Sequence, residues 1–108
     1  MDIDRNNIEE TEPRYVISIA ARMVGVQVHT LRYYEKVGIV EPSRSQGNIR
    51  LYSERDVERL RRVKTLMDDL GVNLAGIEVI LRLSQQIVEL QEQMQEVVSE
   101  LQELREKE

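Results

Sequence analysis

The fold is decided by residues 18–38, which read SIAARMVGVQVHTLRYYEKVG. Apolar residues recur at helical spacing on both sides of Gly25, and glycine ends helices readily because it takes positive φ at no steric cost. The stretch predicts a first helix, capped by Ser18 and ending at about Val24, and a second helix over residues 28–37. Two short helices joined at a glycine are typical of a helix-turn-helix, whose second helix can enter the major groove of DNA.

The segment that follows changes from helical to alternating periodicity. Ile39-Val40 predicts the start of a strand, residues 42–48 are rich in turn formers, and residues 49–52 predict a returning strand. Together they predict a β-hairpin wing beside the helix-turn-helix. Arg44 and Arg50 lie on or near this wing.

A third helix is predicted to start at Ser53 and to end at Gly71. Ser53 and Asp56 have the spacing of a capping box, in which each residue satisfies a backbone N–H of the other. Asn73 predicts the cap of a final helix, and no Gly or Pro interrupts residues 77–108. The expected fold is therefore mainly α, with a winged helix-turn-helix head, a small β-hairpin wing and a long C-terminal coiled-coil helix.

The final helix carries an apolar stripe with the heptad spacing of a coiled coil. At about 1.5 Å per residue the stripe spans about 36 Å, more than a head of about 60 residues can cover, so we expect self-association. The flanking residues are mostly uncharged and do not decide between parallel and antiparallel pairing. The stripe consists of Ile80, Leu83, Ile87, Leu90, Met94, Val97, Leu101 and Leu104.

The formal charge of −5 conceals three unlike segments. Residues 1–13 hold one Arg against five acids, residues 14–64 hold eleven Lys and Arg against five acids, and residues 65–108 hold three against ten. Local charge governs the attraction of phosphate, so the basic segment is suited to DNA although the whole chain is acidic. We expect a disordered acidic arm over 1–13, a DNA-binding domain over 14–76 and a dimerisation helix over 77–108.

Several other functions are disfavoured by composition. The chain has no Cys and a single His, so neither a metal site nor a thiol nucleophile is expected. No phosphate-binding glycine loop and no nucleophile with a nearby base is apparent, which predicts a protein that is not an enzyme and needs no cofactor. Without an apolar run of about 18 residues or a signal peptide, we expect a cytoplasmic, nucleoid-associated protein with no membrane partner.

Side chains suited to DNA lie on the second helix of the predicted helix-turn-helix. Donors near a helix N-terminus suit phosphate and base-edge contacts, whereas Leu31 and Tyr34 are placed to face inward. Tyr33 fits equally as a core or rim aromatic, and Arg32 has ion pairing with Glu35 or with an acid of the third helix as an alternative. The candidates on this helix are His29, Thr30, Arg32, Tyr33 and Lys36.

The wing and the third helix add further candidates. Arg44 and Arg50 have few predicted structural partners, which favours contact with phosphate or the minor groove. Tyr52 either points its hydroxyl at phosphate or closes the hairpin. The third helix carries basic residues for which we expect mixed roles: Arg55, Arg59, Arg61 and Arg62.

Residues 26–35, which read VQVHTLRYYE, resemble the DNA-binding signature of the MerR family. Residues 38–40 (GIV) and the end of the wing at 50–53 (RLYS) extend this resemblance, which covers about residues 14–83. Gln27 departs from the better N-cap residue that is common before this helix, so its first turn is expected to fray.

A narrower resemblance is carried by residues 15–21 (YVISIAA) and 71–77 (GVNLAGI), which are similar to the heat-shock repressor, or HspR-like, subgroup. It implies a homodimer joined by an antiparallel coiled coil, bound to an inverted repeat and repressing chaperone operons, with the DnaK chaperone as co-repressor. Matched by position, it implies base contacts from His29 and Thr30. It implies phosphate contacts from Arg32, Tyr33, Arg44, Arg50 and Tyr52.

Two alternatives stay open. Gly47-Asn48 in the wing and residues 73–77 also suit a MerR-like regulator of nitrogen or other metabolism that is controlled by a partner protein. The acidic flanks suit a coiled-coil adaptor whose helix-turn-helix does not bind DNA.

Overall fold

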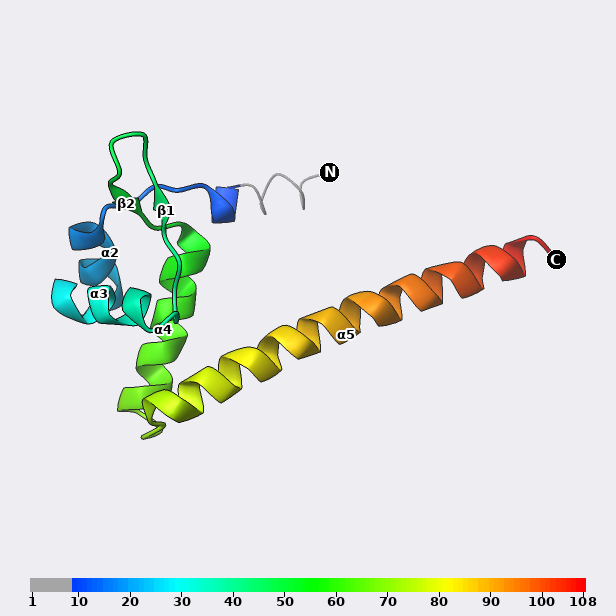
Figure 1. Ribbon diagram of the computed structural model, residues 1–108. Helices are drawn as coiled ribbons and strands as arrows, with labels where there is room; N and C mark the ends of the chain where they lie inside the picture. Colours follow the sequence, from blue (N-terminus) through cyan, green and yellow to red (C-terminus); the bar gives the residue numbers. More distant parts are fainter. Residues whose placement is uncertain (1–8) are drawn as a thin grey trace. The chain divides into compact units, whose positions relative to one another are not determined.

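The computed structural model describes residues 9–108, and the chain divides into two units, one ending at Val72 and the other running from Asn73 to Glu108. Within the described residues, the first unit, called the head below, holds helices α2, α3 and α4 and a two-stranded hairpin, and the second is one helix (Figure 1). The mainly helical class with a small hairpin is confirmed. The head contains α2 (Ile17–Val24), α3 (Val28–Lys36), β1 (Ser43–Arg44), β2 (Arg50–Leu51) and α4 (Glu54–Asp68); the second unit is α5 (Leu74–Glu106).

The start of α2 differs from the prediction that Ser18 caps it. The N-cap is Val16, whose carbonyl accepts hydrogen bonds from the N–H groups of Ile19 and Ala20 at 3.1 and 3.0 Å. Tyr15 forms a β-bridge with Tyr52, which holds the chain extended up to Val16. The helix therefore begins directly after the bridge, before the residue with the better capping side chain.

The turn between α2 and α3 follows the prediction. Gly25 adopts φ 86°, and its N–H donates to the carbonyl of Ala21 at 2.8 Å. Gln27 is the N-cap of α3 and makes no side-chain capping bond, as its sequence position predicted. Leu31 and Tyr34 are buried, so α3 presents its apolar side to the rest of the head.

The hairpin starts later than predicted, because Ile39 and Val40 are buried coil. The N–H of Ile39 donates to the carbonyl of Tyr34 at 2.9 Å, and its own carbonyl accepts from Nε of Arg59 at 2.8 Å. These bonds to the helices occupy the backbone groups that a strand pairing would use. The strands that form are two residues each and antiparallel, with Arg44 opposite Arg50.

Helix α4 begins at the predicted capping box. The N–H of Asp56 donates to Oγ of Ser53 at 3.1 Å, and the N–H of Ser53 donates to Oδ2 of Asp56 at 2.9 Å. Its apolar side meets α2, and α2 also packs against α3. The core of the head consists of Ala20, Ala21, Val24, Leu31, Tyr34, Ile39, Val40, Tyr52, Val57, Leu60 and Val63.

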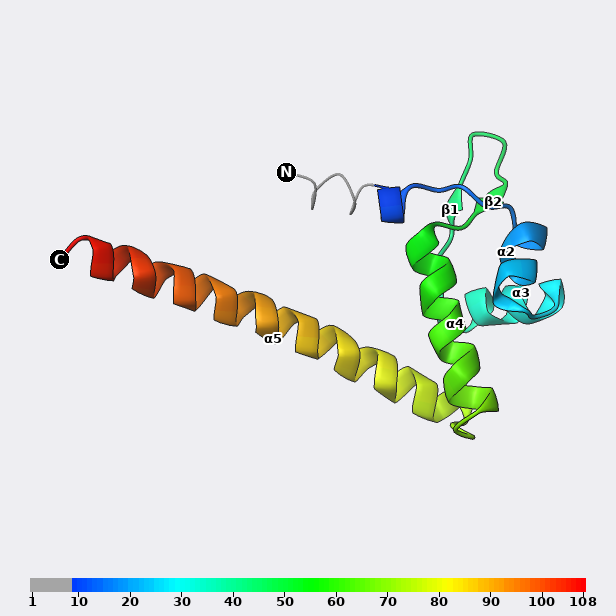
Figure 2. The same ribbon diagram turned by 180° about the vertical axis from the view of Figure 1, so that it is seen from behind.

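Helix α5 runs without interruption for 33 residues (Figure 2). It starts at Leu74 behind the predicted Asn73 cap, whose Oδ1 accepts from the N–H of Gly76 at 2.8 Å. Ile80 is half-buried, and the rest of the predicted heptad stripe is exposed in the single chain by 49–67%. Those residues are Leu83, Ile87, Leu90, Met94, Val97, Leu101 and Leu104.

The predicted acidic arm is described only from residue 9 onward, and residues 1–8 lie outside the described residues. Residues 9–11 form a helical turn where disorder was predicted. Charge contacts at this end of the chain oppose disorder: Glu10 pairs with Arg55 at 3.5 Å, and Glu12 pairs with Arg14 at 3.2 Å. The hydrogen bond that Arg14 donates to Glu12 raises the pKa of the Arg14 guanidinium.

Candidate nucleic-acid interface

Helix α3 presents a polar face to solvent. His29, Arg32, Tyr33 and Lys36 are exposed and follow the i, i+3, i+4, i+7 spacing of one helix face. Within residues 9–108, the side chains of His29, Arg32 and Lys36 have no ion pair or hydrogen bond. Thr30, at the edge of this face, is half-buried. The face therefore offers two cations and an imidazole that the described part of the protein does not use.

The buried side of α3 fixes which residues face outward. Leu31 is fully buried, and the hydroxyl of Tyr34 lies 3.4 Å from Sδ of Met67 in α4. Burial raises the pKa of Tyr34, with Asp68 adding to the effect. Tyr33 is 49% exposed and its ring centroid lies 6.5 Å from that of Tyr34, so it is a rim aromatic and not a core one.

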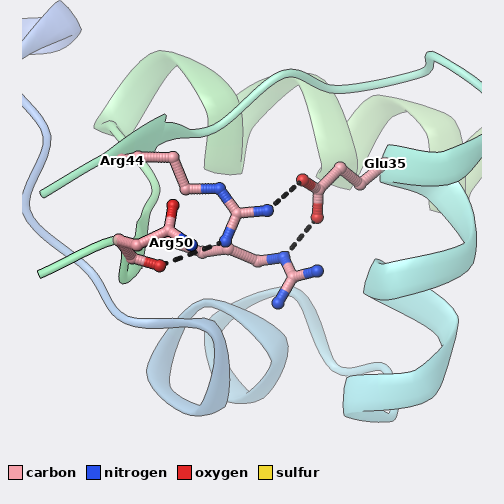
Figure 3. Close-up of polar contacts among 4 residues, drawn as sticks. Glu35, Arg44 and Arg50 are labelled. Atoms are coloured by element: carbon pink, nitrogen blue, oxygen red, sulfur yellow. Dashed lines mark hydrogen bonds and ion pairs between the residues drawn. The ribbon is translucent and has the colours of Figure 1, made fainter.

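The two wing arginines meet the end of α3 at Glu35 (Figure 3). Nη2 of Arg44 lies 3.0 Å from Oε1 of Glu35, and Nε of Arg50 pairs with Oε2 of the same carboxylate. Nη1 of Arg44 also donates to the carbonyl of Asn48 at 3.4 Å. The prediction that these arginines have few structural partners is wrong. The alternative pairing of Arg32 with Glu35 does not form, because Glu35 is taken up by the wing.

Tyr52 is placed in the core and not on the surface. Its side chain is 0% exposed, and its backbone exchanges hydrogen bonds of 2.7 and 2.9 Å with Tyr15. Its hydroxyl has no hydrogen-bond partner within the described residues, and burial raises its pKa. A phosphate contact from Tyr52 is therefore a wrong expectation, and the alternative that it closes the hairpin fits its position.

We expect Tyr52→Phe to leave DNA binding unchanged. A buried hydroxyl without a partner is costly, so the variant should be as stable as wild type or more stable by up to about 1 kcal/mol. Because burial raises the pKa of Tyr52 in the folded state, the unfolded chain loses its phenol proton first. The wild-type free energy of unfolding is therefore unaffected by this group below about pH 10 and falls as the pH rises through the folded-state pKa. The variant should therefore lose less stability than wild type above pH 10. Urea unfolding at pH 7 and pH 10.5 measures both effects, and a loss of 2 kcal/mol at pH 7 would contradict the expectation.

The basic residues of α4 have mixed roles. Arg55 contacts Glu10, and Arg61 lies 3.8 Å from Glu58. Arg59 holds the carbonyl of Ile39 and is structural, which sequence spacing did not reveal. Arg62 is exposed and unpaired within the described residues, so it is the α4 residue best placed to serve a ligand.

Residues 9–108 contain neither a metal-ligand cluster nor a membrane-spanning helix. No three His, Cys, Asp or Glu side chains converge there as a metal site would require. None of the described helices combines the length and apolar character needed to cross a bilayer.

Residues 15–84 match the family described as MerR HTH family regulatory protein. The chain belongs to this family. Among MerR-related proteins, it is 48% identical over 99 residues to a Streptomyces coelicolor protein that carries the name heat shock protein HspR, covering 90% of this chain and 66% of that one. It is 34% identical over 88 residues to the transcriptional regulator GlnR of Bacillus anthracis, covering 79% and 67%. It is 40% identical over 79 residues to the mercuric resistance operon regulatory protein of Pseudomonas fluorescens, covering 72% and 51%.

Solved MerR structures share the fold. The regulator PbrR691 from Ralstonia metallidurans CH34, solved with lead(II), gives a TM-score of 0.62 at 26% identity, covering 86% of this chain and 84% of that one. A MerR-family regulator from Bacillus cereus gives 0.55 at 28% identity, covering 86% and 81%. HiNmlR, solved bound to promoter DNA, gives 0.60 at 22% identity, covering 84% and 75%. The chain thus spans about half to two thirds of the length of these curated relatives and a larger share of the length of the solved MerR chains.

Proposed function

We propose that this chain is a sequence-specific DNA-binding transcriptional regulator that acts as a homodimer on an inverted repeat and represses heat-shock and chaperone genes. The observation that carries the proposal is the exposed, unpaired face of α3, with His29, Arg32 and Lys36 directed away from the core. A helix that keeps cations free of internal partners has them available for phosphate and base edges.

Base reading is assigned to His29 and Thr30, near the N-terminus of α3, where the backbone also favours anions. Phosphate binding is assigned to Arg32, Tyr33 and Lys36, further along the same helix. The wing arginines Arg44 and Arg50 join the phosphate set, as described in the next subsection.

Dimerisation is assigned to the exposed apolar stripe of α5. A stripe exposed by 49–67% on an otherwise polar helix is unfavourable in water, and a second copy offers a complementary heptad stripe of equal length. The acidic segment that carries it, residues 65–108, is repelled by DNA and leaves the basic head as the contact surface. The proposed functional units are a DNA-binding domain over 14–76 and a dimerisation helix over 77–108.

The heat-shock assignment is supported by the 48% identity to the Streptomyces coelicolor HspR. The resemblance of residues 15–21 and 71–77 to the HspR-like subgroup leads us to propose the DnaK chaperone as co-repressor, so that free chaperone would strengthen operator binding. A protein with these partners acts in the cytoplasm, at the nucleoid. The second candidate is a MerR-like regulator of nitrogen or other metabolism that is controlled by a partner protein, which Gly47-Asn48 in the wing and residues 73–77 also suit.

The proposal is tested by measuring the affinity of the full chain for an inverted-repeat operator between 50 and 300 mM KCl. The operator is selected from fragments of the organism's promoters, with and without added DnaK. A dimer making about six phosphate contacts should lose affinity with a log–log slope of about −5. A flat response on every fragment would support the coiled-coil adaptor and overturn DNA binding. Selection of nitrogen-metabolism promoters, with no effect of DnaK, would favour the second candidate.

A further inference from the structure

Glu35 joins the recognition helix to both strands of the wing. Each of its carboxylate oxygens takes one arginine: Oε1 lies 3.0 Å from Nη2 of Arg44, and Oε2 pairs with Nε of Arg50. Figure 3 shows the two guanidinium groups converging on this one carboxylate from β1 and β2. The side chains of Glu35, Arg50 and Arg44 are 21%, 30% and 39% exposed, so solvent screens these pairs less than it screens a fully exposed pair.

The wing is anchored at its base by the bridge between Tyr15 and Tyr52, and the strand pairing beyond that base is short. Its ladder consists of two residue pairs, Ser43 with Leu51 and Arg44 with Arg50, and an isolated hairpin of this size is marginally stable in water. Arg44 reaches further, to the carbonyl of Asn48 at the tip, where Asn48 has φ 61°. The carboxylate of Glu35 thus sets the position of the wing relative to α3 as well as the planes of both guanidinium groups.

Arg44 and Arg50 both keep N–H donors that these contacts do not occupy. An arginine has five N–H donors in a fixed fork. Glu35 takes one atom of each guanidinium, and Asn48 takes one more from Arg44, so both Nη atoms of Arg50 keep all their donors within the described residues. A phosphate oxygen can therefore bind without displacing the carboxylate.

We propose that Glu35 is a positioning residue for DNA phosphate. It remains paired in the DNA complex and holds Arg44 and Arg50 so that their remaining N–H groups receive the phosphodiester backbone beside the bases that α3 reads. This inference rests on the proposed DNA-binding function. The opposite arrangement, in which Glu35 competes with phosphate and is displaced, makes the contrary prediction for the same variant.

The two arrangements predict opposite changes in operator affinity for the variant Glu35→Gln. Glu35→Gln removes a negative charge from a DNA-facing surface, which by long-range electrostatics alone strengthens binding. A neutral amide also has one acceptor oxygen where the carboxylate has two, so it cannot keep the present arrangement, in which each arginine takes a different oxygen. Positioning therefore predicts weaker binding in spite of the more favourable charge.

The test measures operator affinity of full-length Glu35→Gln at several salt concentrations, with Glu41→Gln as the control. Glu41 is exposed and unpaired within the described residues, so its variant changes the charge equally without touching the wing. We expect about tenfold weaker binding and, from the loss of one phosphate contact per protomer, a salt slope shallower by about two for Glu35→Gln, and at most a twofold change in affinity for Glu41→Gln. In an Arg44→Gln, Arg50→Gln background, Glu35→Gln should cause no further loss.

Binding of Glu35→Gln as tight as or tighter than wild type would overturn the proposal. Thermal unfolding checks that Glu35→Gln is folded. If it is not, Arg44→Lys replaces it in the affinity measurement. Lysine keeps the charge but not the fork, so Arg44→Lys should also weaken binding several-fold, and an unchanged affinity would count against positioning. Failure of wild type to bind the operator would instead be a failure of the proposed function.

Discussion

Leu90→Asp should convert the protein from a dimer to a monomer at micromolar concentration. Leu90 lies in the middle of the α5 stripe and is 60% exposed in the single chain. Pairing through the stripe would bury a carboxylate from each copy, at a cost of several kcal/mol per unpaired charge. We expect the dimer to be weakened more than a hundredfold, which sedimentation velocity measures directly.

Loss of the dimer should also abolish tight operator binding. Two linked heads bind an inverted repeat with an advantage of about 10²–10⁴ over one head, because the second contact is intramolecular. Ser99→Asp is the matched control. Position 99 follows Leu90 by nine residues, or two and a half turns, and lies on the opposite side of α5. A dimeric Leu90→Asp, or a monomeric Ser99→Asp, would show that the protomers pair through another surface.

Arg32→Ala and His29→Ala should weaken DNA binding in two different ways. Arg32 is exposed and unpaired within the described residues, so its guanidinium is available for phosphate. Its removal from both protomers should weaken cognate and random DNA alike by about 10- to 100-fold and reduce the salt slope by about two. His29, in the first turn of α3, should lose about 10- to 100-fold on the cognate site only, because base contacts carry the discrimination.

Fluorescence anisotropy on one cognate and one scrambled duplex of equal length distinguishes these outcomes. Both side chains lie outside the core, so circular dichroism should find both variants as helical as wild type. Equal losses on the two duplexes for His29→Ala would remove it from the base-reading set. An unchanged salt slope for Arg32→Ala would remove that residue from the phosphate set.

The parts of the fold that depend on local chemistry could be predicted from sequence. The capping box of Ser53 and Asp56, the Asn73 cap and the left-handed Gly25 each involve residues within a few positions of one another. The outward face of α3 was also predictable, because Leu31 and Tyr34 mark its buried side at helical spacing. These signals place the recognition helix without knowledge of the tertiary structure.

The errors all involve residues distant in sequence. Ser18 is not the N-cap because Tyr15 pairs with Tyr52, and Ile39 is not in a strand because Arg59 takes its carbonyl. Each contact depends on how α4 and the hairpin fold back, which periodicity does not report. The burial of Tyr52 has the same origin.

Among the contacts that were not predicted from sequence, the pairing of Glu35 with the wing is the most informative. Arg44 and Arg50 follow Glu35 by 9 and 15 residues, and the charge count of the basic segment treats all three as independent. A carboxylate at the end of a recognition helix, ahead of a hairpin with two arginines, was the available signal. Its meaning depends on the register that places Arg44 opposite Arg50.

The flanks of the α5 stripe have a consequence for how protomers are exchanged. Ser84, Gln86, Gln91 and Gln93 are uncharged, so apolar contact would hold the proposed pair together, and ionic strength does not weaken such contact. Phosphate contacts respond in the opposite way. Rising salt should therefore release intact pairs from DNA, with both heads leaving and returning together. The rate of subunit exchange between pairs is then independent of the residence time on the operator.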